Sequence, residues 1–182
     1  MNRSEALLIL NQNLSQDALL KHSLATESIM RALALCLGEN PDRWGQIGLL
    51  HDLDFEITRE DMSRHGRETI NILSSHLDKE AQNAILSHNE ETGIARTGKL
   101  DFALASAESI TGLIVATALV YPDKKIASVK SSSVVKRMKQ PAFARAVSRE
   151  NIRLCEKIGL SLEQFVELSL KAMSMISSEL GL

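Results

Sequence analysis

A histidine and an aspartate stand side by side at positions 51 and 52, where they close the apolar run 47–50. Burying an imidazole beside a carboxylate costs several kcal/mol unless a partner satisfies both groups. Neutral imidazole and ionised carboxylate are both ligands of divalent cations, so a metal ion is one natural partner for His51 and Asp52. A helix end at which both side chains face water explains the same dipeptide. The pair alone favours that second explanation, and the case for a metal depends on the other histidines.

The four other histidines are spread through the first half of the chain. His22, His65 and His88 each lie within or beside an apolar stretch, and each is a candidate for an inward-pointing ligand. His76 stands among polar residues, and we expect it to be exposed. A single histidine of this kind is more often a core or surface residue than a ligand, but several around one aspartate strengthen the metal hypothesis. An all-helical interaction module without a metal would need their order to be a coincidence.

The ordered set of histidines and acids resembles the HD superfamily of metal-dependent phosphohydrolases. The resemblance covers about residues 18–120 and rests on the strings Gly-Leu-Leu-His-Asp at 48–52, Ala-Ile-Leu-Ser-His-Asn at 84–89 and Ala-Ser-Ala-Glu-Ser-Ile-Thr-Gly-Leu at 105–113. It implies an all-α, HD-domain-like helical bundle with extra C-terminal helices. It also implies one metal bound by His22, His51, Asp52 and Glu108.

The last of these ligands departs from the family's pattern. The family has an aspartate where this chain has Glu108, whose side chain is one methylene longer. A glutamate can bind a metal through oxygen as an aspartate does, so the departure bears on full activity more than on metal binding. Asp101 lies two helical turns earlier on the same helix face and is a less favoured alternative ligand.

In the superfamily, extra histidines between the His-Asp pair and the last acid mark the binuclear members, so the resemblance favours a second metal here. In that arrangement His65 and His88 bind the second ion and Asp52 bridges the pair, and two ions about 3.5–4 Å apart can clamp the oxygens of a phosphate ester. With a single metal, His65 or His88 would instead contact the phosphate. Asp52, His65 and His88 are therefore the expected catalytic residues. Mixed nitrogen and oxygen ligands suit Mn, Fe, Co, Ni or Zn better than Mg or Ca, so we expect one or two divalent ions of that group.

Asp54 follows the central pair closely. It is either a solvated loop acid or the hydrogen-bond partner that a metal-bound imidazole usually requires. The sequence favours the first interpretation but leaves both open.

Basic residues gather at positions 123–149, which carry a net charge of +7 in a chain whose total is −2. Such asymmetry can steer an anionic substrate, and we expect Lys136, Arg137 and Ser131 to bind its phosphate. A solvated basic surface with a serine cap is the alternative. Aromatic residues are not interleaved with these charges, so nucleic acid is not an expected partner.

Length predicts one domain over residues 1–182. The resemblance implies a core at about 18–120, which leaves a helical extension at about 121–182. Good helix formers dominate, and β-branched alternation is almost absent, so the fold should be all-α. Residues 53–64 and 89–99 are expected to be loops. The expected helices span 4–11, 16–37, 42–52, 65–76, 79–88, 100–120, 131–138, 142–157 and 162–180.

The cellular location is predicted from the cysteines, the first residues and the longest apolar stretch. Cys36 and Cys155 lie far apart in apolar helical contexts and are expected to be reduced core thiols of a cytoplasmic protein. The first residues do not resemble a signal peptide. The longest near-apolar stretch, 110–121, is too short to span a bilayer, so a membrane is not an expected partner. The sequence does not indicate an oligomeric state.

The expected function is that of a metal-dependent phosphohydrolase, a phosphomonoesterase or phosphodiesterase, acting on a small phosphorylated molecule. A nucleotide is the first candidate, and this substrate class comes from the resemblance alone. The alternative is a non-catalytic HD domain that binds a nucleotide or a partner protein, with Glu108 as a sign of drift. The ligand set favours the enzyme, because a drifted binder usually loses several ligands and here one is altered conservatively.

Overall fold

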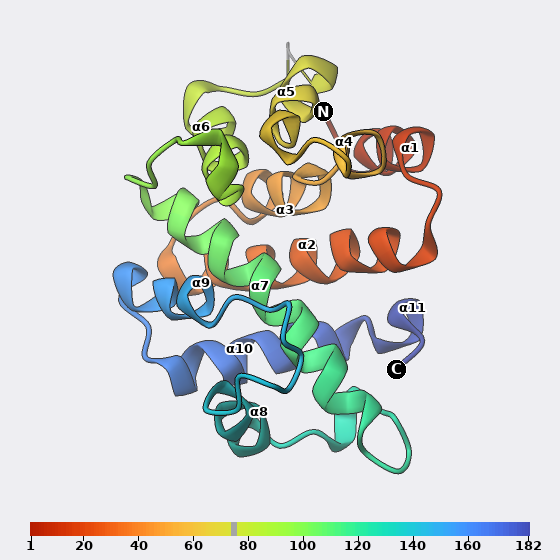
Figure 1. Cartoon of the computed structure of the whole chain (residues 1–182), viewed down its shortest axis with the longest axis vertical. Helices are drawn as coiled ribbons and strands as arrows, with labels where there is room; N and C mark the ends of the chain where they lie inside the picture. The colour runs from red at the N-terminus through yellow and green to blue at the C-terminus, as the bar shows by residue number, and fades with distance from the viewer. Residues whose placement is uncertain (74–75) are drawn as a thin grey trace.

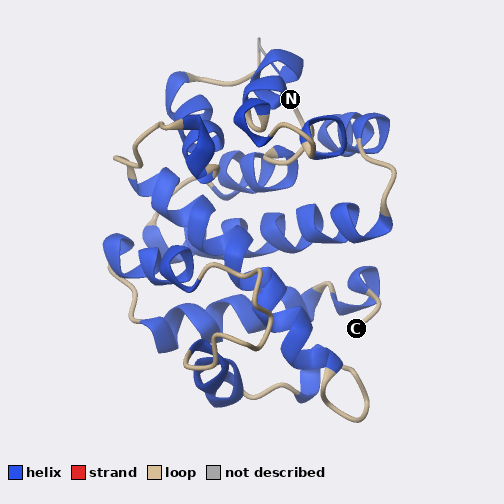
Figure 2. Ribbon diagram, viewed as in Figure 1, coloured by secondary structure: helices blue, strands red, loops and turns tan. Residues whose placement is uncertain are grey.

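The computed structural model describes residues 1–73 and 76–182, and within these residues every regular element is a helix (Figures 1 and 2). The prediction of an all-α fold is therefore confirmed. The α-helices are α1 (Arg3–Asn13), α2 (Asp17–Leu37), α3 (Pro41–Leu50), α4 (Phe55–Thr58), α5 (Arg67–Leu73), α6 (Lys79–His88), α7 (Lys99–Leu119), α8 (Ser131–Met138), α9 (Arg149–Arg153), α10 (Leu162–Met175) and α11 (Ser177–Leu180). The 3₁₀ turns are η1 (Met62–Arg64), η2 (Glu90–Thr92), η3 (Ile126–Ser128) and η4 (Leu154–Ile158).

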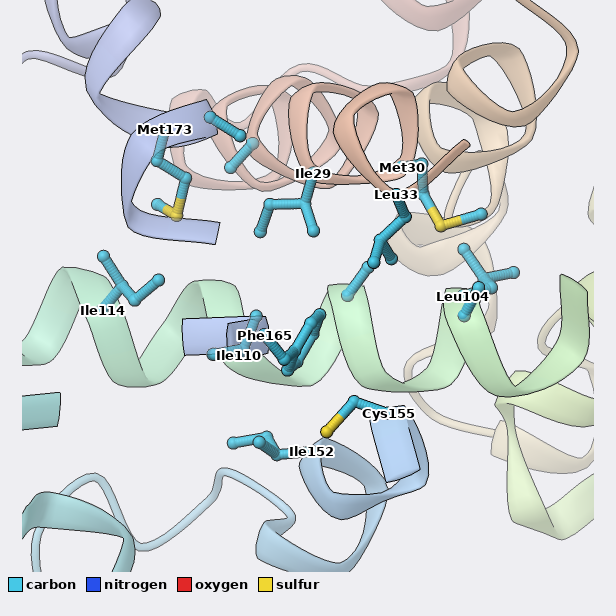
Figure 3. Close-up of a cluster of buried hydrophobic side chains, with 14 of the residues drawn as sticks. Ile29, Met30, Leu33, Leu104, Ile110, Ile114, Ile152, Cys155, Phe165 and Met173 are labelled. Atoms are coloured by element: carbon cyan, nitrogen blue, oxygen red, sulfur yellow. The ribbon is translucent and has the colours of Figure 1, made fainter. Parts of the chain in front are cut away.

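Helix α7 forms the centre of the bundle. It packs against α2, α6, α8, α9 and α10 and is buried along most of its length. Figure 3 shows Leu104, Ile110 and Ile114 of α7 between side chains of α2 on one side and Ile152 and Cys155 on the other. One hydrophobic cluster thus contains residues from both sides of position 120, because α8, α9 and α10 cover the face of α7 that α2 and α6 leave free.

The full length of α7 is also apolar enough for a membrane span, which a reading of residues 110–121 alone does not reveal. Two thirds of the residues in its most apolar 18-residue stretch are buried inside this bundle. Its composition is therefore explained by its place as the core helix.

A tight connection sets α3 against α2. Gly38 follows the last residue of α2 and lies in the left-handed region (φ 72°), where glycine is favoured. Asn40 caps the start of α3, and Pro41 is its first residue, a position that suits proline. Gly48 then lets the two helices approach closely, since a Cβ there would lie 3.0 Å from the Thr26 carbonyl oxygen. This close approach brings the end of α3, with His51, toward His22 on α2.

Several predicted boundaries were wrong. The expected loops 53–64 and 89–99 contain the short elements α4, η1 and η2. The expected helix at 65–76 begins only at Arg67, because Gly66 has φ 86°; positions 74 and 75 lie outside the described residues. The last expected helix is interrupted at Ile176, which separates α10 from α11.

The largest error concerns the expected helix at 142–157. Residues 141–148 form irregular turns, and regular helix begins only at Arg149. The Arg149 guanidinium donates to the backbone carbonyls of Gln140, Phe143, Ala144 and Val147. Two of those carbonyls, of Gln140 and Ala144, also accept the backbone N–H three residues on, which forms turns and not α-helix. Local helix propensity cannot indicate that one guanidinium collects all four carbonyls.

The two cysteines are both free, and they differ in environment. Cys155 is buried, and burial raises the pKa of its thiol to about 12. Cys36 is exposed, so the expectation of two core thiols was wrong for that residue.

Candidate metal centre

Four imidazoles surround the carboxylate of Asp52. The Nε2 atoms of His51, His65 and His88 lie 3.2, 3.3 and 3.2 Å from Asp52 Oδ1. The Nε2 atom of His22 lies 3.5 Å from Asp52 Oδ2. The elements that supply them are α2 for His22, the end of α3 for the central pair, the turn before α5 for His65 and the last residue of α6 for His88. His76, in contrast, is exposed as expected.

The first two imidazoles are oriented through their other ring nitrogen. His51 is fully buried, and its Nδ1 lies 2.8 Å from the carbonyl oxygen of Gly48, which can only accept. His22 Nδ1 lies 3.0 Å from the hydroxyl of Thr111, and that hydroxyl donates its own proton to the Glu108 carbonyl oxygen at 2.6 Å. Both Nδ1 atoms therefore carry the proton, and both Nε2 atoms present a lone pair toward Asp52.

The other two imidazoles are held in the same way. His88 Nδ1 donates to the Ile85 carbonyl oxygen, one turn back in α6. His65 Nδ1 donates to Asp54 Oδ1 at 2.7 Å, while Asp54 Oδ2 accepts from the backbone N–H groups of Gly66 and Thr69. Asp54 is fully buried, so it is the partner of an imidazole and not the solvated loop acid that the sequence favoured.

These contacts leave nitrogen lone pairs facing one another. His65 and His88 bring their Nε2 atoms to 3.0 Å, and His22 and His51 bring theirs to 3.3 Å. Two neutral acceptors at such distances repel unless a proton or a cation lies between them. A divalent cation satisfies both nitrogens and the carboxylate together, so the donor set fits a metal.

The ligand atoms form two groups that share one residue. His22, His51 and Asp52 each offer an atom within 4.8 Å of the others, and so do Asp52, His65 and His88. Five of the six residues predicted as metal ligands are thus brought together. Asp52 belongs to both groups, which is the place of a bridging carboxylate.

The electrostatics of the centre keep Asp52 ionised. Burial alone would raise its pKa, but the nearby His51 ring and the close contacts with His65 and His88 hold the pKa of Asp52 well below its usual value. Burial lowers the pKa of His51 to about 3, so this ring is neutral at physiological pH. Burial also acts to lower the pKa of His65, yet Asp52 and Asp54 outweigh it and raise that pKa to about 9. A metal at His65 must therefore displace a proton.

Glu108 lies beside the two ligand groups but in neither of them. It is half-buried on α7, lines the same hollow as Asp52, and accepts a 2.5 Å hydrogen bond from the Ser109 hydroxyl. Burial raises the pKa of its carboxyl, an effect that His22 partly offsets. Its role as a ligand stays a prediction. Asp101, the alternative, instead caps α7, where its Oδ2 accepts from the backbone N–H groups of Thr97 and Gly98.

A hollow of about 390 Å³ opens over Asp52, His65 and His88. Sequence reasoning missed three residues beside it. Asn151 and Ser148 line the hollow from the start of α9, although no motif singles them out. Arg96 donates to the carbonyl oxygens of Ser87 and His88 and to Asn151 Oδ1, so one guanidinium ties the end of α6 to α9.

The predicted phosphate contacts lie elsewhere. Lys136 and Arg137 line a separate hollow of about 390 Å³, together with Tyr121 and Gln140, near the far end of α7. Arg137 also stacks on the ring of Phe143, with its Cζ 4.2 Å from the ring centre. Ser131 is the first residue of α8. The structure does not bring these three residues to the imidazole cluster, and their role toward a substrate stays a prediction.

Comparison with known proteins agrees with the donor set. A family model described as the HD domain matches residues 19–149, which is more than half of the chain. No curated protein and no solved structure matched it. The match runs past position 120, to the start of α9, so it includes part of the predicted helical extension. The HD domain family consists generally of hydrolases that bind divalent metal ions, and this chain belongs to it.

Proposed function

We propose that this protein is a metal-dependent phosphohydrolase that cleaves the phosphate ester of a small molecule, with nucleotides as the first class to test. One observation carries the proposal. Two groups of three ligand atoms share Asp52, and the four imidazoles around it are oriented by separate hydrogen bonds from their Nδ1 atoms. That arrangement suits a pair of cations better than a single structural ion, because no group closes a full coordination sphere by itself.

The ions would neutralise charge on the phosphate and acidify a water molecule. The chain's own residues do the positioning. Asp52 remains ionised and so offsets the charge of both ions, and His51 offers a neutral nitrogen at any physiological pH. The hollow over the cluster falls in the size range of small-ligand sites. At its edge, the Asn151 amide and the Ser148 hydroxyl can hold phosphate oxygens.

The test uses the full chain, purified without a histidine tag. Its metal content is measured by elemental analysis, and its activity is measured on a panel of phosphomonoesters and phosphodiesters with Mn²⁺, Co²⁺ or Ni²⁺. Asp52→Asn should lower metal content and turnover together, because it removes the ionised ligand that both groups share. The matched control is Asp61→Asn, the same change at an exposed position of the neighbouring turn. Turnover that survives both Asp52→Asn and a chelator would refute the proposal, and metal binding without any turnover would favour the non-catalytic alternative.

A further inference from the structure

The hollow over the metal centre continues along α7 into two more hollows. It shares Glu108, Ser148 and Asn151 with a second hollow of about 370 Å³. The second shares His22, Thr111 and Gly112 with a third of about 330 Å³. We call this row of three hollows the α7 groove. The shared residues place its hollows one after another, from the metal centre past His22.

The floor of the α7 groove is a stripe of α7 itself. Glu108, Gly112 and Val115 are partly exposed at positions i, i+4 and i+7, while most residues between them are buried. Gly112 keeps the floor low. A Cβ at this position would lie 3.0 Å from Val147 Cγ2, so the irregular segment 141–148 already passes close above it. The groove thus narrows at Gly112 and opens again toward Val115.

The third hollow differs in chemistry from the metal end. Its walls are mainly apolar and come from Ala18, Ala25, Val115, Leu180 and Leu182. Leu180 belongs to α11, which packs under the N-terminal half of α2 beside α7 (Figure 1). The metal end instead carries the exposed carboxylates of Glu90 and Glu91.

Cationic side chains are scarce along the groove. Among the described residues that line its three hollows, the single lysine or arginine is Lys21, and its Nζ pairs with Asp17 Oδ2 at 2.8 Å. A second or third phosphate would find no spare cation among these lining residues, and at the open end it would meet Glu91 and Glu90, whose Oε1 lies 3.5 Å from the Arg96 guanidinium. An apolar group in the third hollow would leave water at a gain of about 25 cal/mol per Å².

We infer that the substrate is a phosphomonoester whose organic part is uncharged and largely apolar, with that part seated in the third hollow beside Val115. This inference rests on the proposed function and deepens it. It names the class of alcohol or phenol released, and it excludes di- and triphosphates and charged sugar phosphates as preferred substrates.

The experiment compares probes that share one phosphate. Binding of 1-naphthyl phosphate and glycerol 2-phosphate to the metal-loaded full chain is measured by titration calorimetry, and turnover is measured separately by phosphate release. We expect 1-naphthyl phosphate to bind at least about tenfold more tightly, because its ring buries apolar area in the third hollow. ATP should bind no better than glycerol 2-phosphate.

Two variants locate the ring. Val115→Gln should weaken 1-naphthyl phosphate about fivefold or more and leave glycerol 2-phosphate unchanged. Val115→Thr keeps the shape of the side chain, so it preserves the fold while shifting binding in the same direction. Leu119→Gln is the control, since Leu119 is an exposed aliphatic residue at the end of the same helix and lines none of the three hollows.

The outcomes separate the two proposals. If both esters are hydrolysed and bind with equal affinity, or if 1-naphthyl phosphate binds more tightly but equally well to the Val115 variants, the inference is wrong and the proposed hydrolase function stands. If 1-naphthyl phosphate binds in a Val115-dependent way but no ester is hydrolysed, the proposed hydrolase function is wrong and the apolar ligand site is supported.

Discussion

Asp54→Asn tests the idea that a buried carboxylate fixes the ligating nitrogen of His65. The wild-type side chain accepts three hydrogen bonds, one from His65 Nδ1 at 2.7 Å and two from backbone N–H groups of Gly66 and Thr69 at 2.7 and 2.9 Å. An asparagine has a single acceptor oxygen. If that oxygen serves the two backbone groups, its NH₂ faces His65 Nδ1, and the ring must move its proton to Nε2 to avoid two opposed donors.

The expected cost has two parts. Replacing one charge-assisted hydrogen bond in a buried site should lower the unfolding free energy by about 1.5–3 kcal/mol. A proton on His65 Nε2 removes the lone pair that a metal needs, and loss of such an orienting partner typically weakens metal binding about 10–100-fold. The loss should fall on the group formed by Asp52, His65 and His88, while the group with His22 and His51 keeps its affinity.

The assay is competition for Co²⁺ or Mn²⁺ with a chromophoric chelator, together with urea unfolding of the metal-free protein. Asp61→Asn is again the control, because it makes the same chemical change in an exposed turn nearby. A folded Asp54→Asn variant that binds as many ions as the wild type, with the same affinities, would refute the reasoning. It would show that the His65 ring keeps its ligating nitrogen without the carboxylate.

Three further predictions concern Glu108, the basic segment and the N-terminal cap of α6. Glu108→Gln should weaken metal binding by about tenfold or more and Glu108→Asp should preserve it, as measured by the same competition; unchanged binding in Glu108→Gln would show that this carboxylate is not a ligand. Reversing Lys136 and Arg137 to glutamate should raise KM with kcat unchanged, and less so at high salt, if the basic segment steers substrate; an unchanged KM would leave these residues a solvated surface. Asp78 accepts from the Ala81 N–H and from Arg43, which hold the pKa of its carboxyl below the usual value. The stability that the ionised Asp78 contributes is therefore complete above about pH 4 and disappears as the pH falls through the folded-state pKa. In urea titrations at pH 3–7, the unfolding free energy of Asp78→Asn should therefore fall less steeply toward acid pH than that of the wild type. Equal pH dependence in the two proteins would contradict this.

The imidazole cluster could be predicted from the sequence because its members carry rare chemistry. Several histidines beside apolar stretches strengthened the metal hypothesis, and their order around Asp52, which resembles the HD superfamily, implied the ligand set. Asp54 could not be assigned, because its partners Gly66 and Thr69 come from a different segment and an acid after a helix end is usually solvated. No sequence motif indicated Arg96, because its three hydrogen-bond acceptors belong to α6 and α9, which are distant or unrelated in sequence pattern.

The errors in the fold have the same origin. Residues 142–148 favour a helix locally, but the carbonyl oxygens of residues 143, 144 and 147 accept hydrogen bonds from the Arg149 guanidinium, and the segment forms irregular turns. The net charge of the segment 123–149 is visible in the sequence, but the direction in which Lys136 and Arg137 point depends on how α8 packs against α7 and α10. Local composition predicts elements and charge, whereas the placement of both follows from long-range packing.

The five side chains of the two ligand groups, Asp52 included, come from four segments that are far apart in the chain, from α2 to the end of α6. An ion bound there works as a cross-link, and the unfolded chain has no equivalent site. Such an ion stabilises the fold by mass action, by about 2.7 kcal/mol when its free concentration is a hundred times its dissociation constant. Survival of this protein against heat and proteases should therefore follow the free metal concentration of its surroundings. Starvation for the metal would lower the stability of the folded protein together with any metal-dependent activity.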